Sequence, residues 1–360
     1  MNILYLISYA GAAGTEKYVE NLMHIFSAQG HRCTLVYTDG GALAEKAKEL
    51  GCDAVRMNLH ASHTLSAARS LAKLCDERSI DVIHAQYPRE NVIAVLSRLF
   101  RKKTRVVFTS HLTVTQNALW RLINRAVTPH NAACIAVCTQ GSELLRKNGV
   151  APEKIRVIFN GVIPKKLPPR QNIIREEYHL DENCFVFLTM ARYAPEKGLF
   201  FLLDSLAALK EKTARPFVCL IAGDGELFDA VGREIAKKGL SGCVIRAGYR
   251  NDTENLLCSA DAYVSSALCN EAMSFAVLEA MECGLPIAVT DVGAGADLAR
   301  GCGFCASPGD TETMSDHLLT LMTDETVRRE YGTAAHRRAV TEFDLRKQAE
   351  TLFGLYAGKI

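Results

Sequence analysis

The chain has no apolar stretch that approaches the roughly 18 residues a membrane-spanning helix needs. It also has no low-complexity segment and no short-period repeat, and its 48% hydrophobic and 23% charged residues are typical of a globular protein with a full core. The first ten residues carry no cationic segment ahead of their apolar run, so we expect a first strand there and not a signal peptide. These absences predict a cytoplasmic protein.

Motifs for metals and for nicotinamide cofactors are scarce as well. Cys302 and Cys305 form the one Cys-x-x-Cys pair, and no second Cys or His pair stands at zinc spacing, so a buried turn is favoured over a metal or redox site. No Asp-x-Asp occurs, and no Gly-x-Gly-x-x-Gly follows an apolar run, which disfavours a nicotinamide dehydrogenase. We expect no bound metal and no cofactor.

Charge is nearly balanced over the whole chain but not along it. The net charge is +2, yet residues 1–165 hold 21 Lys and Arg against 12 Asp and Glu, while the remainder holds 21 against 28. This asymmetry predicts that the first part faces an anionic partner, such as a membrane surface or a phosphorylated acceptor, with no nucleic acid expected. A basic run follows the apolar helical stretch 92–100, and either docks at the inner face of a membrane or simply ends that helix. Its members are Arg98, Arg101, Lys102, Lys103 and Arg105.

Short apolar runs alternate with amphipathic stretches in two series. This alternation predicts buried parallel strands covered by helices, and therefore an α/β fold of two Rossmann-like, doubly wound domains that face each other across a deep cleft. The first series comprises residues 3–7, 33–37, 82–85, 106–108, 134–137 and 157–159, and the second comprises 185–190, 217–222, 244–247, 262–264 and 287–289.

A proline-rich segment at residues 163–170 separates the two series and predicts a linker. We expect residues 1–165 to form an N-terminal domain and residues 166–344 to form a C-terminal domain. Asp344 is a plausible N-cap for a last helix, and we expect residues 345–360 to cross back and pack on the first domain.

The segment 270–286 is the most informative for chemistry. Ser274 predicts the N-cap of a helix over residues 275–283, and the amides of Met273, Ser274 and Phe275 would offer a diphosphate the positive end of that helix. Glu271 lies before the helix and Glu279 lies within it, so one carboxylate could hold sugar hydroxyls and the other a ribose. Local physics alone leaves solvated carboxylates as an equal alternative.

The two glutamates, separated by seven residues, precede Ala-Met-Glu-Cys-Gly-Leu-Pro. This pattern resembles the paired-glutamate signature of family-4 retaining glycosyltransferases of the GT-B fold. Residues 190–198, Met-Ala-Arg-Tyr-Ala-Pro-Glu-Lys-Gly, are similar to the family's Gly-Arg-Leu-x-x-Glu-Lys-Gly segment. The resemblance implies that Arg192 and Lys197 bind the donor diphosphate and stabilise the charge on the leaving group.

Further pieces of the resemblance lie in loops. Gly11 and Gly14 fall in a loop similar to the family's Gly-Gly-x-Glu, which closes over the donor, although Ala13 replaces one glycine. His111 follows an apolar run where the family often places a histidine beside the reacting sugar. The segment 248–252 implies that the backbone near Tyr249 and Arg250 frames the nucleobase.

The sequence departs from the family at two other points. Ile163 stands where an aspartate is usual, and Glu271-Ala-Met-Ser274 replaces the common Glu-Gly-x-Pro, which leaves the donor sugar open. The resemblance implies a metal-independent hexosyltransferase that moves a sugar from a nucleoside diphosphate, UDP favoured, to a hydroxyl of a glycan or lipid-linked acceptor. It implies an acceptor domain at residues 1–165 and a nucleotide-sugar-binding domain at residues 166–344, and a role in envelope or extracellular polysaccharide synthesis. A non-catalytic GT-B-like binding protein and a nucleotide-sugar 2-epimerase are the alternatives.

Overall fold

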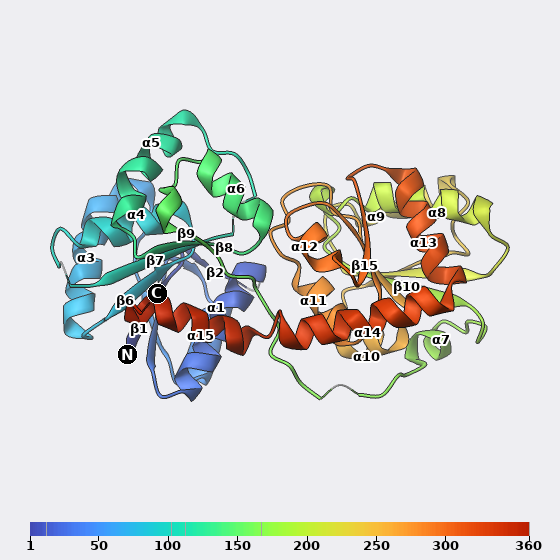
Figure 1. Ribbon diagram of the computed structural model, residues 1–360, viewed down its shortest axis with the longest axis horizontal. Coiled ribbons are helices and arrows are strands. Elements are labelled where there is room, and N and C mark those ends of the chain that lie inside the picture. The colour runs from blue at the N-terminus through green and yellow to red at the C-terminus, as the bar shows by residue number, and fades with distance from the viewer. Residues whose placement is uncertain (12, 102, 112, 167, 360) are drawn as a thin grey trace. The chain divides into compact units, whose positions relative to one another are not determined.

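The structure is a computed structural model that describes residues 1–359 apart from residues 12, 102, 112 and 167. It divides into two compact units (Figure 1). Unit 1 comprises Met1–Asn160 together with Leu345–Ile360, and unit 2 comprises Gly161–Asp344. Within the described ranges, no helix is both long enough and apolar enough to cross a bilayer.

Unit 1 contains a seven-stranded parallel sheet in the order β5-β3-β1-β6-β7-β8-β9. The central strands are almost wholly buried, which is why they appear in the sequence as continuous apolar runs. The chain runs from β1 toward one edge and then returns to continue from β6 toward the other, so the strand order reverses between β1 and β6. The strands are β1 (Asn2–Leu6), β3 (Arg32–Tyr37), β5 (Asp53–Arg56), β6 (Val82–Ala85), β7 (Arg105–Ser110), β8 (Ala133–Ala136) and β9 (Ile155–Val157), with β2 (Tyr9–Ala10) and β4 (Asp39–Gly40) as a separate pair.

Helices cover this sheet, and the last of them comes from the far end of the chain. α15 packs beside α1 and β7, so the red C-terminal helix lies among the blue and green elements of unit 1 (Figure 1). Leu352, Leu355 and Tyr356 of α15 are buried. The helices are α1 (Gly14–Ala28), α2 (Ala42–Glu49), α3 (Thr64–Glu77), α4 (Pro88–Ser97), α5 (Ala118–Val127), α6 (Thr139–Lys147) and α15 (Leu345–Ala357), with short 3-10 turns at Ala61–His63, Thr128–His130 and Pro152–Lys154.

A buried histidine connects α15 to the sheet. His84 Nδ1 is hydrogen-bonded to the Tyr356 hydroxyl at 2.6 Å, and His84 Nε2 to Thr109 Oγ1 at 2.7 Å. Burial, and then the neighbouring charge of His111, lowers the pKa of His84 to about 3. The imidazole is therefore neutral at neutral pH and keeps one donor and one acceptor nitrogen for these two hydroxyls.

Acid is expected to destabilise unit 1 through His84. An unfolded chain binds this proton below the ordinary pKa of about 6.5 while the native protein does not, so the free energy of unfolding falls as pH drops from 6.5 toward 3. At pH 5 the loss is about 2 kcal/mol. Urea unfolding at pH 7 and pH 5, followed by the fluorescence of the single Trp120, measures it. An unchanged pH slope in His84→Gln would contradict this assignment.

Unit 2 contains a six-stranded parallel sheet in the order β12-β11-β10-β13-β14-β15. The strand order reverses between β10 and β13, and ligands of doubly wound sheets bind beyond the carboxyl ends of the strands at such a point. The strands are β10 (Phe185–Met190), β11 (Phe217–Ala222), β12 (Val244–Gly248), β13 (Ala262–Ser265), β14 (Ile287–Thr290) and β15 (Gly303–Ala306). The helices are α7 (Ile173–Glu177), α8 (Leu199–Lys212), α9 (Phe228–Lys237), α10 (Thr253–Ser259), α11 (Phe275–Glu282), α12 (Gly295–Ala299), α13 (Thr311–Thr323) and α14 (Glu325–Thr341), and Pro195–Lys197 forms a 3-10 turn, η4.

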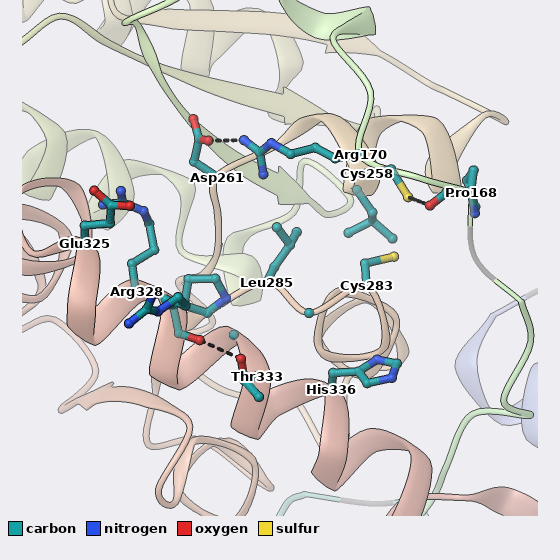
Figure 2. Close-up of a pocket in the computed structure, with 15 residues that line it drawn as sticks. Pro168, Arg170, Cys258, Asp261, Cys283, Leu285, Glu325, Arg328, Thr333 and His336 are labelled. Atoms are coloured by element: carbon teal, nitrogen blue, oxygen red, sulfur yellow. Dashed lines mark hydrogen bonds and ion pairs between the residues drawn. The ribbon is translucent and has the colours of Figure 1, made fainter.

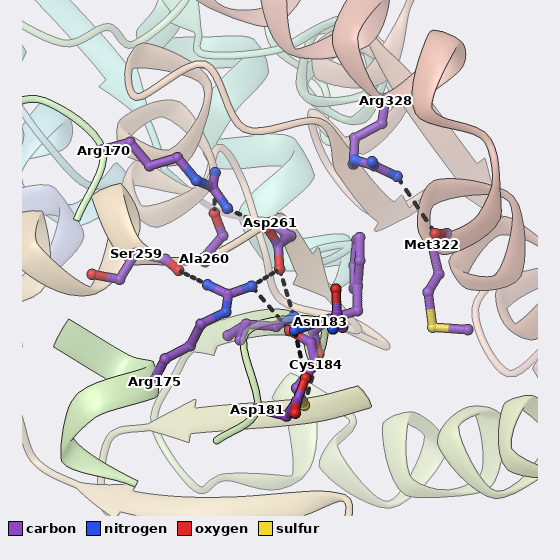
Figure 3. Close-up of polar contacts among 12 residues, drawn as sticks. Arg170, Arg175, Asp181, Asn183, Cys184, Ser259, Ala260, Asp261, Met322 and Arg328 are labelled. Carbon is purple, nitrogen blue, oxygen red and sulfur yellow. Dashed lines mark hydrogen bonds and ion pairs between the residues drawn. The ribbon is translucent and has the colours of Figure 1, made fainter. Parts of the chain in front are cut away.

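The amino ends of β10 and β13 are held by an ion-pair network. Asp261 pairs with Arg170 and with Arg175, the latter at 2.6 Å, and accepts the backbone N–H of Val186 at 2.8 Å. Arg175 also donates to the carbonyls of Ser259 and Cys184 (Figure 3). These contacts hold the amino ends of the two strands together.

The predicted fold class, two α/β units with parallel doubly wound sheets, is confirmed. Two strands of the main sheets, β5 and β15, were not expected, and neither was the short pair β2 and β4. The strand expected at residues 157–159 lies earlier, as β9. All thirteen cysteines are free thiols, and nine of them are buried. Among these, Cys302 bonds to the carbonyl of Leu298 at 3.0 Å, as expected of a packed turn.

Candidate functional site

The loop after β10 carries the two predicted cations and is fixed by the loop after β11. Tyr193 N donates to the carbonyl of Asp224 at 2.9 Å, and Ala191 N donates to the last residue of β11. Gly223 allows this close approach, because a Cβ there would lie 1.9 Å from the Ala191 carbonyl oxygen. The backbone on either side of Arg192 is therefore held at the carboxyl end of the sheet, beside the reversal of strand order.

Lys197 is the last residue of η4, which follows β10, and its side chain extends toward the loop that follows β13. Its ammonium pairs with Glu271, and the two side chains are only 22% and 18% exposed. The hydroxyl of Ser266, just after β13, donates to the Lys197 carbonyl at 2.9 Å and so joins the two loops. A shielded pair of this kind is screened less than a surface pair, and each partner fixes the position of the other.

Arg192 is placed differently. Its side chain is 72% exposed and donates to Glu196, four residues on, at 2.6 Å. An exposed pair of this type contributes at most about 1 kcal/mol, so the guanidinium can exchange Glu196 for an anionic ligand at little cost.

The helix predicted after residue 274 is α11. Ser274 Oγ accepts a hydrogen bond from Val277 N at 3.4 Å, which confirms its place as N-cap. The remaining first-turn amides, Phe275 among them, have no partner within the helix and form the positive end of its dipole. Met273 is buried just ahead of the cap. This terminus follows the Glu271 loop directly, so it can bind an anion on the same side of unit 2 as Lys197.

A buried tyrosine, which sequence reasoning missed, joins these parts. The hydroxyl of Tyr263 donates to the carbonyl of Met190 and accepts its N–H, both at 3.2 Å. Burial above all, and then the negative charges of Glu279 and Glu271, raises the pKa of Tyr263. Both glutamates thus act electrostatically on one side chain between β10 and α11, which places them in the same region of unit 2.

Tyr249 and Arg250 follow β12, as expected. Tyr249 is 81% exposed. The Arg250 guanidinium is taken up by two carboxylates, with contacts of 2.8 Å to Asp252 and 2.6 Å to Glu177, and these contacts raise the pKa of Arg250. The Arg250 side chain therefore connects this loop to α7, and the backbone of Tyr249 and Arg250 remains available to a nucleobase.

The predicted residues of unit 1 lie at the carboxyl ends of β1 and β7, on either side of that unit's switch point. Gly14 opens α1, and Gly11 packs so closely against Tyr9 that a Cβ would lie 2.3 Å from its ring. His111 Nε2 is hydrogen-bonded to Gln86 Oε1 at 3.1 Å, and its ring meets the ring of Tyr18 edge-on at 5.2 Å.

Burial lowers the pKa of His111 to about 3. A neutral imidazole can hold a sugar hydroxyl by one hydrogen bond, but it supplies no positive charge near pH 7. Gln86 was not predicted from the sequence. A polar residue directly after the buried strand β6 is the signal that could have revealed it, because such residues lie where parallel strands present ligand-binding groups.

The basic run between α4 and β7 is largely occupied by protein acceptors. Arg98 donates to the carbonyl of His130 at 2.6 Å, Arg101 to that of Ile80 at 2.7 Å, and Arg105 to that of Leu355 at 3.2 Å. Of the remaining two cations, Lys103 is exposed, whereas Lys102 lies outside the described residues.

A cavity of about 660 Å³ lies elsewhere in unit 2. Figure 2 shows that its walls include Cys283 at the end of α11, His336 on α14 and Asp261 at the amino end of β13. Asp261 is already paired with Arg170 there. This cavity lies at the opposite end of the strands from Lys197 and Glu271, so it is not the candidate donor site.

Two doubly wound units, with shielded cation, carboxylate and helix terminus at the switch point of the second, define a glycosyltransferase of the GT-B fold. Residues 170–338 match the family described as Glycosyl transferases group 1, and residues 12–166 match Glycosyltransferase Family 4. The chain belongs to the family-4 glycosyltransferases.

Curated relatives extend over most of the chain. The UDP-Gal:alpha-D-GlcNAc-diphosphoundecaprenol alpha-1,3-galactosyltransferase of Escherichia coli is 26% identical over 302 residues, which cover 80% of this chain and 78% of that protein. The N-acetyl-alpha-D-glucosaminyl L-malate synthase of Bacillus anthracis is 22% identical, over 81% of this chain and 79% of its own.

Solved structures share the whole fold. A glycosyltransferase from Rickettsia africae superposes with a TM-score of 0.86 at 20% identity, covering 99% of this chain and 97% of its own. Anabaena HepE in complex with UDP and glucose superposes with a TM-score of 0.85 at 19% identity, covering 99% and 100%. At these identities the likeness shows the fold alone.

Proposed function

We propose that this glycosyltransferase transfers a hexose-type sugar from a nucleoside diphosphate donor, with UDP-sugar favoured, to an acceptor hydroxyl with retention of anomeric configuration. The observation that carries the proposal is the shielded Lys197–Glu271 pair beside the N-terminus of α11. The E. coli relative, named for UDP-Gal and a diphosphoundecaprenol acceptor, supports a UDP-sugar and a lipid-linked or glycan acceptor in envelope or extracellular polysaccharide synthesis. We propose that the protein acts at the inner face of the membrane, where such an acceptor would be accessible to it.

Unit 2 would hold the donor through charge. The amides at the start of α11 and the side chains of Arg192 and Lys197 bind the diphosphate, Glu279 accepts hydrogen bonds from the ribose, and Glu271 accepts them from the sugar. Lys197 then stabilises the negative charge that develops on the leaving diphosphate. Glu271 positions the sugar and the ammonium together, and forms no covalent intermediate.

Transfer requires that one bond forms as another breaks on the same face of the sugar. The acceptor oxygen attacks the anomeric carbon, the bond from that carbon to the diphosphate oxygen breaks, and the departing oxygen takes the acceptor's proton. In unit 1, neutral His111 can hold a sugar hydroxyl, and the loop of Gly11 and Gly14 can bind phosphate through its backbone. Exclusion of water from the reacting sugar prevents hydrolysis of the donor.

We further propose that no metal is needed, because two cations and a helix terminus already face the diphosphate. Thermal unfolding with a panel of nucleoside diphosphates and their sugars, in the presence of EDTA, tests both points. We expect one donor to stabilise the wild type by about 2.7 kcal/mol at a hundred times its Kd. That stabilisation is expected to be lost in Lys197→Ala and in Glu279→Ala.

Lys212→Ala is the matched control, because Lys212 is also ion-paired in unit 2 and is 23% exposed. No stabilisation of the wild type by any nucleotide would favour the non-catalytic binding protein. Conversion of a UDP-sugar to its 2-epimer without an acceptor would favour the epimerase. Stabilisation that appears only when EDTA is left out would overturn metal independence.

A further inference from the structure

Helix α5 of unit 1 leaves large apolar side chains exposed to solvent. Leu119 and Leu122 are 64% and 60% exposed, and Val114 in the preceding loop is exposed as well. The side of the helix that faces the protein is also largely apolar, since Val127 packs against the core, and the one buried residue of the helix is Asn124. The apolar side of α5 is therefore wider than the surface that the protein covers, and the leucines lie on its uncovered part.

The inner side of α5 is anchored by specific hydrogen bonds, which fix the orientation of the helix. Asn124 Nδ2 donates to the carbonyl of Asn148 at 2.8 Å and to Gln116 Oε1 at 2.7 Å. Asn117 caps the helix by accepting the Trp120 N–H at 3.0 Å. Rotation of the helix to bury its leucines would break these bonds, so Leu119 and Leu122 stay exposed in the folded protein.

The charge around this face has one sign. Arg121 and Arg125 lie on the exposed side of α5 next to the leucines, and the helix contains no acidic residue. Residues 91–142 contain seven Lys and Arg and no Asp or Glu. Leucines flanked by arginines, with a tryptophan in the same helix, suit the interface of a bilayer that carries anionic headgroups, where apolar burial and charge attraction act together.

We propose that α5 docks this glycosyltransferase on an anionic lipid bilayer, with Leu119 and Leu122 inserted and with Arg121 and Arg125 at the headgroups. The docking surface is thus α5 and not the basic run between α4 and β7, whose three arginines already donate to protein carbonyls. The inference goes beyond the proposed transfer reaction and does not depend on which donor is used.

Flotation with vesicles tests the docking without nucleotide, so its outcome is separate from that of the donor experiment. Wild type is expected to float with vesicles of phosphatidylcholine and phosphatidylglycerol at low salt, and far less with phosphatidylcholine alone. Leu119→Asp/Leu122→Asp and Arg121→Glu/Arg125→Glu are each expected to weaken partitioning about tenfold or more. Trp120, the only tryptophan, lies on α5, so its emission should shift to the blue when anionic vesicles are added.

The matched control is Lys46→Glu/Lys48→Glu, a double charge reversal on α2, which should float like the wild type. Thermal unfolding of each variant checks that the exposed substitutions leave the fold intact. The proposal is overturned if wild type does not float, if both α5 variants float as well as wild type, or if Lys103→Glu alone abolishes flotation. It is also overturned if Leu119→Asp/Leu122→Asp converts a dimer to a monomer, since a second copy would then cover the face.

Discussion

Replacement of Lys197 by alanine is expected to lower kcat by about 10²-fold to 10³-fold, the range found when one fixed group that stabilises transition-state charge is removed. Glu271 holds the ammonium, and the Ser266 hydroxyl holds the backbone carbonyl of Lys197. The lysine therefore needs no reorganisation as charge develops on the diphosphate. Initial rates with the donor identified by thermal unfolding measure the effect. Lys197→Arg keeps the charge and should retain part of the activity.

Two comparisons separate this role from a structural one. Lys212→Ala removes an equally shielded ion-paired lysine from the same unit and should leave kcat unchanged. Glu271→Gln should raise KM and lower kcat without abolishing donor binding, because Lys197 remains. If Lys197→Ala lowers kcat less than about threefold, the leaving group is stabilised by other residues, and the proposed role of this lysine is wrong.

Gly198→Ala is expected to remove most activity and to lower the free energy of unfolding of unit 2 by about 2–4 kcal/mol. Gly198 has a φ of +63°, and an added Cβ would lie 2.1 Å from the carbonyl oxygen of Ser266. That oxygen belongs to the backbone, so the loop after β13 and the turn that contains Lys197 have to move apart. This movement would separate the Lys197 ammonium from Glu271. Calorimetric unfolding and initial rates of the same preparation measure both effects.

Gly239→Ala is the control that measures the cost of a positive φ for alanine separately from the cost of a steric clash. Gly239 has a φ of +65° and no atom within 4 Å of the position of its Cβ, so alanine there introduces the left-handed conformation without a clash. We expect a loss of about 1 kcal/mol and full activity. Equal losses of activity in both variants would contradict the argument from the Ser266 contact.

The sequence predicts the architecture well, because buried parallel strands are short apolar runs whichever helices cover them. The two strands of the main sheets that it misses, β5 and β15, are edge strands. β5, Asp-Ala-Val-Arg, is exposed at both ends and has no apolar run, and β15 begins with a glycine. Such strands are defined by their hydrogen-bonded neighbour, which no local pattern contains.

The candidate site divides along the same line. Individual residues such as Lys197 and Glu271 can be named from a local motif, but their pairing joins positions 74 residues apart and depends on the tertiary fold. The ion pair between Arg250 and Glu177 likewise cannot be predicted from the sequence. Periodicity shows that α5 is amphipathic, but the exposure of Leu119 and Leu122 depends on how the fold anchors the helix through Asn124.

The assignment of α15 to unit 1 has a consequence for biosynthesis. A ribosome makes β1 to β9 first, then all of unit 2, and only afterwards the helix whose Leu352 and Tyr356 complete the core of unit 1. Domains generally fold in the order of their synthesis. Here unit 2, which is one continuous segment, can finish folding before unit 1, although the synthesis of unit 1 begins first. The nascent chain therefore carries an uncovered apolar patch around Phe26 while all of unit 2, Gly161–Asp344, is translated. Chaperones that bind such patches should act on this protein during that interval.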